Sequence, residues 1–257
     1  MSTTTARVPA GKPRTLVLDR LLLLALLLLL WQAVGSWTQG MAITGPLVTF
    51  AYVGQLVLTT GFWGQAWTTM AAFLLAFVLS AVCGLLLGLV LGLRRFAGDV
   101  MEPVLAGFYT IPKVTLYPVV LLLFGLGMSA KVAFGVMHGL VPVTLFTIAA
   151  IKTLPPALPR TARALRLSPG QTMRWVLLPA CLPQIVGGLR LSFSLSLLGV
   201  LIGEMFSSQR GLGFLLVNGL AQHNVALSTA VVLLIVVFAV GANTAMLRLS
   251  RMMTRSD

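Results

Sequence analysis

Charged residues are scarce in this chain, and acidic residues are the scarcest of all. Only 9% of the 257 residues are charged, against about 25% in soluble domains, and only five are Asp or Glu. Hydrophobic residues make up 58% of the chain. The two cysteines give no disulfide framework, because Cys83 lies in an apolar run and Cys181 is expected in a basic loop. This composition excludes an ordinary soluble domain and predicts a membrane protein.

The sequence also lacks the usual motifs of enzymes. It contains no G-x-x-x-x-G-K-S/T phosphate-binding loop, no Asp-rich pair, no His/Cys cluster and no nucleophile motif. We therefore expect no enzymatic activity and no metal site in this chain. A formal net charge of +13 could indicate binding to nucleic acid. However, the Lys and Arg residues lie between the apolar runs, as in the cytoplasmic loops of membrane proteins, so no nucleic-acid partner is expected.

What the chain does contain is a series of long apolar runs. About 20 apolar residues cross the hydrocarbon core of a bilayer as a helix, and these runs lack the alternation of a membrane strand. The fold class is therefore an all-α membrane protein. The first run could be a signal peptide, but no small-x-small cleavage site follows it, so we expect an uncleaved span. Six spans are predicted, at Leu18–Gly35, Thr68–Leu93, Pro103–Gly125, Val132–Ile151, Ile185–Phe206 and Val225–Met246.

Basic residues in the connecting segments predict the orientation. They gather in the N-terminal tail (1–19), at Arg94 and Arg95, in the segment 152–184 and in the C-terminal tail (248–257). The positive-inside rule assigns these segments, and hence both termini, to the cytoplasm.

The opposite side is nearly free of charge, since only Lys131 and Arg210 are expected in its loops. Glycine interrupts the uncharged residues 38–67, which we expect to form a short interfacial helix on the outer surface. The first span and this outer stretch form one segment (20–67), and the main helical bundle follows over 68–247.

The cytoplasmic segment 152–184 is far longer than a turn and has no acidic residue. Its first half carries apolar residues at helical spacing with arginines between them, and Ser168, Pro169 and Gly170 then break the chain. A second helical piece is expected to end at Pro179 and Pro183. Two interpretations remain open: a docking element for a cytoplasmic partner, or a basic loop lying on anionic lipid headgroups.

The same segment resembles the EAA loop of type I ABC importer permeases, which reads E-A-A-x-x-L-G-x-S, then V-x-L-P-x-x-x-P, then G-L-R. Here the matching residues are Arg160–Ser168, Val176–Pro183 and Gly188–Arg190, and the family's late E and G-L-G correspond to Glu204 and Gly211–Gly213. Upstream, Ile111–Pro118 and Phe124–Gly127 resemble the nitrate, sulfonate and taurine branch. The resemblance extends over about residues 68–246.

This resemblance implies the permease subunit of an ABC importer in a bacterial inner membrane, with six helices and an alternating-access mechanism. Two permease copies, expected as a homodimer, would enclose one path. Two cytoplasmic ATPase subunits would hold ATP and Mg²⁺, so this chain itself would bind no cofactor. An extracytoplasmic binding protein would deliver a small, often anionic solute such as a sulfonate, nitrate or taurine. The alternative is an ATP-independent transporter or channel, which would need a coupling-ion carboxylate, and Glu204 is its only candidate.

The resemblance also implies that the EAA-like loop is a coupling helix seated in a groove of the ATPase. Arg160 replaces the family's acidic residue, so we expect acidic residues in the partner's groove. Arg166 replaces the usual glycine, so either the turn differs there or Gly170 takes over the break. The implied coupling residues are Arg160, Thr161, Ala162, Arg163, Leu165, Arg166, Leu167 and Ser168.

Polar residues within the spans are candidates for the translocation path, because burying them in a membrane is costly. Lys113 lies in a stripe spaced by four residues, in a span that Pro112 and Pro118 are expected to interrupt, and it either lines the path or snorkels to the interface. Glu204 either lines a gate or pairs with Arg210. The candidates are Tyr109, Lys113, Tyr117, His138, Ser192, Ser196 and Glu204.

Three further interpretations concern residues that either pack helices together or line the path. His138 either lines the path or is a hydrogen-bonded packing residue. The stripe of Gly84, Gly88 and Gly92 predicts a close approach between two helices. The stripe with Ser192 and Ser196 is expected to face either the path or the partner permease.

Overall fold

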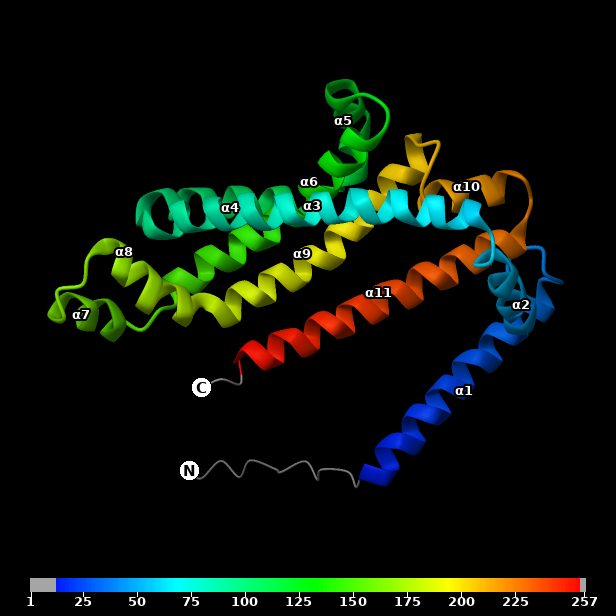
Figure 1. Cartoon of the computed structure of the whole chain (residues 1–257), viewed down its shortest axis with the longest axis horizontal. Helices are drawn as coiled ribbons and strands as arrows, with labels where there is room; N and C mark the ends of the chain where they lie inside the picture. The colour runs from blue at the N-terminus through cyan, green and yellow to red at the C-terminus, as the bar shows by residue number, and fades with distance from the viewer. Residues whose placement is uncertain (1–12, 255–257) are drawn as a thin grey trace.

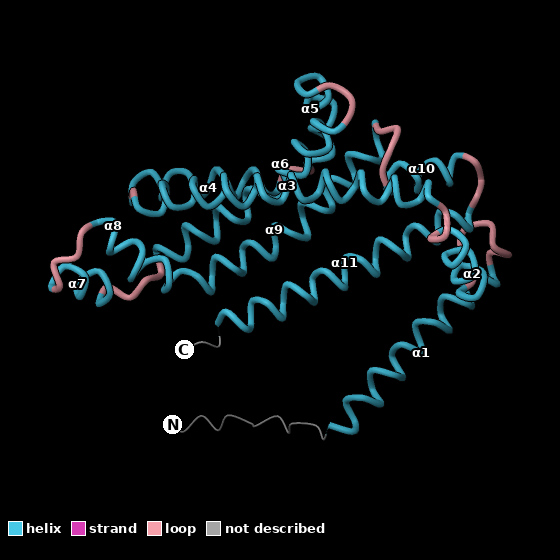
Figure 2. Tube along the Cα trace, in the orientation of Figure 1, coloured by secondary structure: helices cyan, strands magenta, loops and turns pink. Residues whose placement is uncertain are grey.

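The computed structural model describes residues 13–254, and within that range it contains helices and turns but no strand (Figures 1 and 2). The long helices are α1 (Pro13–Trp37), α3 (Thr60–Leu93), α6 (Met128–Lys152), α9 (Leu178–Ser207) and α11 (Val225–Thr254). The shorter elements are α2 (Pro46–Leu56), α4 (Arg95–Thr110), η1 (Lys113–Leu116), α5 (Tyr117–Phe124), α7 (Ala157–Ala164), α8 (Pro169–Thr172), η2 (Met173–Leu177) and α10 (Leu212–Ala221). The predicted all-α class is confirmed.

Among the described residues, five helices are long and apolar enough to cross a membrane, and a sixth span exists if a bent pair is counted as one. That pair is the predicted third span: α4 and the η1–α5 segment meet at 90°. Ile111 and Pro112 have extended backbones, and the proline lacks an N–H group, so the helix breaks there as expected. The expected break at Pro118 is wrong. Pro118 lies in the first turn of α5, where a missing N–H group costs nothing.

The outer segment is more helical than predicted. Helix α2 is the expected short helix, but α3 begins at Thr60 rather than Thr68 and contains Gly61 and Gly64. Inside a membrane, a helix satisfies its own backbone hydrogen bonds, and this requirement outweighs the weak helix propensity of glycine.

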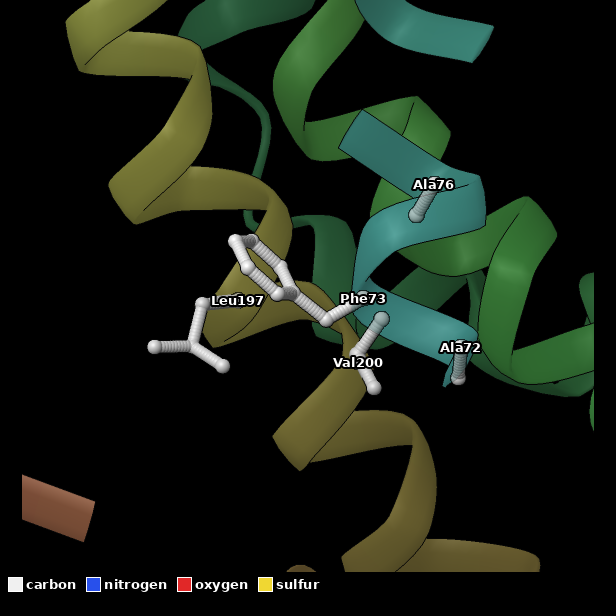
Figure 3. Packing of buried hydrophobic residues seen from close by; sticks show 5 residues of the cluster. All are labelled: Ala72, Phe73, Ala76, Leu197 and Val200. Carbon is white, nitrogen blue, oxygen red and sulfur yellow. The ribbon is translucent and has the colours of Figure 1, made fainter. Parts of the chain in front are cut away.

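The core consists of α3, α6 and α9, with α6 packed along both of the others. Ala72, Phe73 and Ala76 of α3 pack against Leu197 and Val200 of α9 (Figure 3). The predicted glycine stripe is confirmed as a packing surface. A Cβ atom at Gly84 would lie 2.7 Å from the Val143 Cβ atom, so the helices can approach this closely only because the side chain is absent.

The turn between α3 and α4 lies at the same end of the molecule as α7 and α8, whereas α2 and α10 lie at the other end (Figure 1). The basic residues of the first end identify it as cytoplasmic. Helix α5 projects away from the bundle, and α1 lies apart from the core and contacts α2 (Figure 1).

Candidate coupling element and translocation path

Helix α7 ends in a motif that explains the turn after the predicted coupling residues. The Leu167 N–H group donates to the Ala162 carbonyl (3.0 Å), and the Arg166 N–H group donates to the Arg163 carbonyl (3.0 Å). These two bonds form a Schellman motif, whose turn residue adopts a left-handed backbone. That residue is Arg166, with φ of 51°. The break therefore occurs at Arg166 itself, without the family's glycine, and does not shift to Gly170.

The predicted coupling residues divide into an anchored side and an exposed side. Ala162 is 2% exposed and faces the protein, where α7 packs against η2. Leu165 is 66% exposed, although it is apolar. Leu167 is partly buried, and Ser168 caps α8 through a reciprocal capping box with Gln171. The exposed side also carries Arg160, Thr161, Arg163 and Arg166.

The predicted end of the second helical piece in segment 152–184 is wrong. Pro179 and Pro183 do not end a helix, because α8, η2 and α9 follow one another without a break from residue 169 to 207. Pro179 stands in the first turn of α9, after the π-helical turn η2, and only Pro183 lies in the helix interior. Cys181 is consequently a buried residue of α9 rather than a loop residue.

The three residues predicted to form one stripe on the third span are separated by the break. Lys113 lies in η1 and is 8% exposed; its Nζ atom is 4.8 Å from the centre of the Tyr109 ring and 3.4 Å from the Tyr109 carbonyl oxygen. Tyr109 itself is 38% exposed. Tyr117 is buried on the other side of the break, and its hydroxyl donates to the Gly203 carbonyl (2.7 Å). A stripe along one continuous helix is therefore wrong.

His138 lies in the interior of this copy. Its Nδ1 atom is 2.9 Å from the Phe134 carbonyl oxygen, and its ring lies against the Phe134 ring with centroids 4.6 Å apart. This is the arrangement of a hydrogen-bonded packing residue.

Ser192 and Ser196 are fully buried between α3, α6 and α9. A Cβ atom at Gly139 of α6 would lie 2.7 Å from the Ser80 Oγ atom of α3 and 2.8 Å from the Ser192 Oγ atom. The serine stripe therefore packs within one copy and, in this structure, faces neither an open path nor the surface that a partner would cover.

Glu204 has partners that the sequence did not suggest. Its carboxylate is fully buried, lies 3.6 Å from the Lys131 Nζ atom, and accepts hydrogen bonds from the Thr69 hydroxyl (2.8 Å) and the Gly213 N–H group (3.0 Å). The alternative pairing with Arg210 is wrong. Lys131, expected in an outer loop, is a buried residue of α6 and donates to the Arg210 carbonyl (2.5 Å).

These contacts explain the G-L-G motif. Gly211 has φ of 119°, a conformation that favours glycine, and a Cβ atom there would collide with the Glu204 carboxylate. The Gly211 N–H group donates to Gln65, and the Leu212 N–H group donates to Thr69. Gln65, Thr69 and Lys131 were missed, and only the ionisable Lys131 offered a signal, through its place beside the fourth predicted span.

Comparisons with known proteins agree with this architecture. A family model described as "Binding-protein-dependent transport system inner membrane component" matches residues 80–256. A probable ABC transporter permease protein of Haemophilus influenzae is 29% identical over 86% of this chain and 90% of its own. The riboflavin transport system permease protein of Chloroflexus aurantiacus is 34% identical over 75% of this chain and 73% of its own. Other relatives are named as permeases for taurine, aliphatic sulfonates and nitrate.

The fold is also found in a solved transporter. An inward-facing structure of the MetNI methionine ABC transporter has a chain that matches with a TM-score of 0.63 and 22% identity, over 74% of this chain and 94% of that one. Subunits of this kind are not catalytic, and a separate subunit is the ATPase. With its five to six membrane spans and a family match over residues 80–256, this chain belongs to the binding-protein-dependent inner membrane components, the permease subunits of type I ABC importers.

Proposed function

We propose that two copies of this permease enclose one path and move a small anionic solute into the cytoplasm. The observation that carries the proposal is Lys113, a buried cation at the break in the third span. No carboxylate lies within 4.0 Å of its Nζ atom among the described residues. A buried cation without a counter-charge is costly, and in a membrane it points to a functional site.

The surroundings of Lys113 suit an anion that binds reversibly. Its Nζ atom makes one long hydrogen bond to a carbonyl and lies near the rings of Phe108 and Tyr109. An ammonium group carries three donors, so at least two remain for a sulfonate, carboxylate or nitrate oxygen. Charge-assisted hydrogen bonds of this kind are among the strongest in proteins.

The exposed break supports the pairing of two copies. Ile111 and Val114, on either side of Pro112 and Lys113, are 42% and 40% exposed. Non-helical backbone is tolerated at membrane depth only where protein or a water-filled cavity covers it. A second copy set against this surface would cover the break and leave a wet path between the two chains.

In the proposed cycle, the transporter has two global states, and ATP binding to the partner subunits favours one of them. A ligand shifts such an equilibrium only by the difference between its affinities for the two states, so ATP must bind one state more tightly than the other. An ATP-independent mechanism is disfavoured. Its only candidate carboxylate, Glu204, is held by Lys131, Thr69 and Gly213 rather than free to bind a coupling ion.

Lys113→Met is expected to raise the KM for uptake of an anionic solute about 10- to 100-fold, because it removes a charge-assisted hydrogen bond worth about 1.5–3 kcal/mol. Lys113→Arg keeps the charge and should stay within a few-fold of wild type. The measurement is uptake into proteoliposomes that contain the permease, its ATPase and its binding protein, with a panel that includes taurine, nitrate and riboflavin. Equal uptake of every anion by Lys113→Met and wild type would contradict the assignment.

Arg160→Glu is expected to weaken binding of the cognate ATPase, because the exposed arginines of α7 should face acidic residues in its groove. Pull-down in detergent without anionic lipid checks this and removes the lipid-headgroup alternative. Arg174→Glu, at the exposed start of the η2 turn, is the matched control and should bind nearly as wild type. Retention of the ATPase by Arg160→Glu as tightly as by wild type would count against an acidic groove.

A further inference from the structure

Two acidic residues of α4 converge on the last residue of α6. The Lys152 Nζ atom lies 2.6 Å from Asp99 Oδ1 and 2.7 Å from Glu102 Oε2. The chain has only five acidic residues, and two of them hold this one lysine. The site lies at the cytoplasmic end, and neither the resemblance nor the path accounts for it.

Helix α4 is anchored mainly at this point. Gly98 is its one buried residue, and a Cβ atom there would lie 2.6 Å from the Leu91 carbonyl oxygen and 3.5 Å from the Lys152 Cε atom. The remaining residues of α4 are exposed or partly exposed. A 16-residue helix is about 24 Å long, so α4 is a rod that is held tightly near its first turn and loosely beyond it.

The two ends of this rod lie beside the two functional regions. Lys152 is joined to the coupling helix α7 by residues 153–156, of which Pro155 and Pro156 restrict the backbone. The far end of α4 carries Tyr109 and leads directly into the break and Lys113. A continuous route of covalent bonds and ion pairs therefore runs from α7 through Lys152 to the path.

We infer that Lys152 is a positioning residue that makes α4 follow the coupling helix, so that movement of α7 reorients the break at Ile111–Pro112. This inference rests on the proposed function. The lysine side chain is 26% exposed, and those of Asp99 and Glu102 are 63% and 44% exposed. Ion pairs this exposed contribute little to stability, so their removal should alter transmission and leave the fold intact.

The experiment measures ATP hydrolysis and solute uptake in the same proteoliposomes containing permease, ATPase and binding protein. Lys152→Gln should lower the uptake per ATP hydrolysed by about fivefold or more, the usual size of coupling between two sites. The Asp99→Asn/Glu102→Gln double variant removes the acidic partners of Lys152 instead, and it should lower the uptake per ATP hydrolysed to a similar extent. Lys152→Arg should restore coupling, and Arg95→Gln, which removes an exposed cation of α4 with no ion pair among the described residues, is the matched control.

Three results would overturn the inference: a wild-type ratio in Lys152→Gln, uncoupling by Lys152→Gln but not by the double variant, or loss of ATPase binding instead of coupling. Spin labels at Gly107 of α4, which has open surroundings, and at the exposed Ala157 of α7 add a readout in the otherwise intact protein. Their separation should stay constant when ATP binds, and a change would refute joint movement. If wild-type uptake proves independent of the ATPase, the proposed function fails instead.

Discussion

Glu204→Ala is expected to destabilise this permease by about 3–5 kcal/mol, the usual effect of removing one partner of a buried ion pair. The substitution leaves the Lys131 side chain, which is 4% exposed, without its counter-charge. It also removes the acceptor of the Gly213 N–H group in the first turn of α10. Thermal unfolding of the detergent-solubilised protein should show a large fall in Tm, together with loosening of α10.

A double-mutant cycle separates the charge pair from the hydrogen bonds. Lys131→Met and Glu204→Gln should each be destabilising, because each leaves one charge buried alone. The double variant should be more stable than the sum of the two effects predicts. Strict additivity would mean that Lys131 and Glu204 do not interact in the folded protein.

Gly88→Ala is expected to destabilise the bundle by about 1–3 kcal/mol, the usual cost of overpacking a core. A Cβ atom there would lie 2.5 Å from the Thr147 Cβ atom and 2.9 Å from the Thr144 carbonyl oxygen. The carbonyl belongs to the backbone of α6, so relief requires the whole helix to move away from α3. Gly88→Val should be worse still, and the Tm of both variants is the measurement.

Gly64→Ala is the matched control for this prediction, because it is the same change on the same helix. Nothing lies within 4 Å of a Cβ atom at Gly64, so the change should be neutral or stabilising. An equal loss of stability in both variants would contradict the prediction, because it would show that the contact between α3 and α6 is not the cause; helix propensity cannot be the cause either, since it favours alanine over glycine.

Particular residues show which parts of the site could be predicted from sequence. The predicted coupling residues Arg160–Ser168 could be identified because they are contiguous and lie in a basic segment between two spans, and their coupling role stays a prediction. The family's glycine at the position of Arg166 indicates a turn, but that an arginine keeps the left-handed backbone there was not predictable, because residues other than glycine rarely adopt it. The partners of Glu204 were missed because Thr69 and Lys131 lie 135 and 73 positions away, and local patterns carry no information at that distance.

The prolines show the same limit. Pro112 was correctly predicted to interrupt its helix, whereas Pro118, Pro179 and Pro183 were not interruptions. Pro183 lies inside α9 without ending it, because neighbouring groups in a membrane bundle can satisfy the backbone carbonyl that a proline frees. Pro118 and Pro179 lie in the first turn of a helix, where proline is favoured, so the effect of these two residues depends on where the helix begins. That starting point is decided by packing and by the need to satisfy backbone groups within a membrane.

By itself, the sequence determined that the chain is a helical membrane protein, which segments span the bilayer, and which loops face the cytoplasm. Each of these depends on transfer energies summed over about 20 consecutive residues and on charges in adjoining loops, and such quantities are local. Only the tertiary structure decided the 90° break of the third span, the burial of Ser192 and Ser196, and the convergence of Asp99 and Glu102 on Lys152. These features depend on how closely α3, α4, α6 and α9 can approach one another, and that is set by the side-chain volumes of residues far apart in the chain.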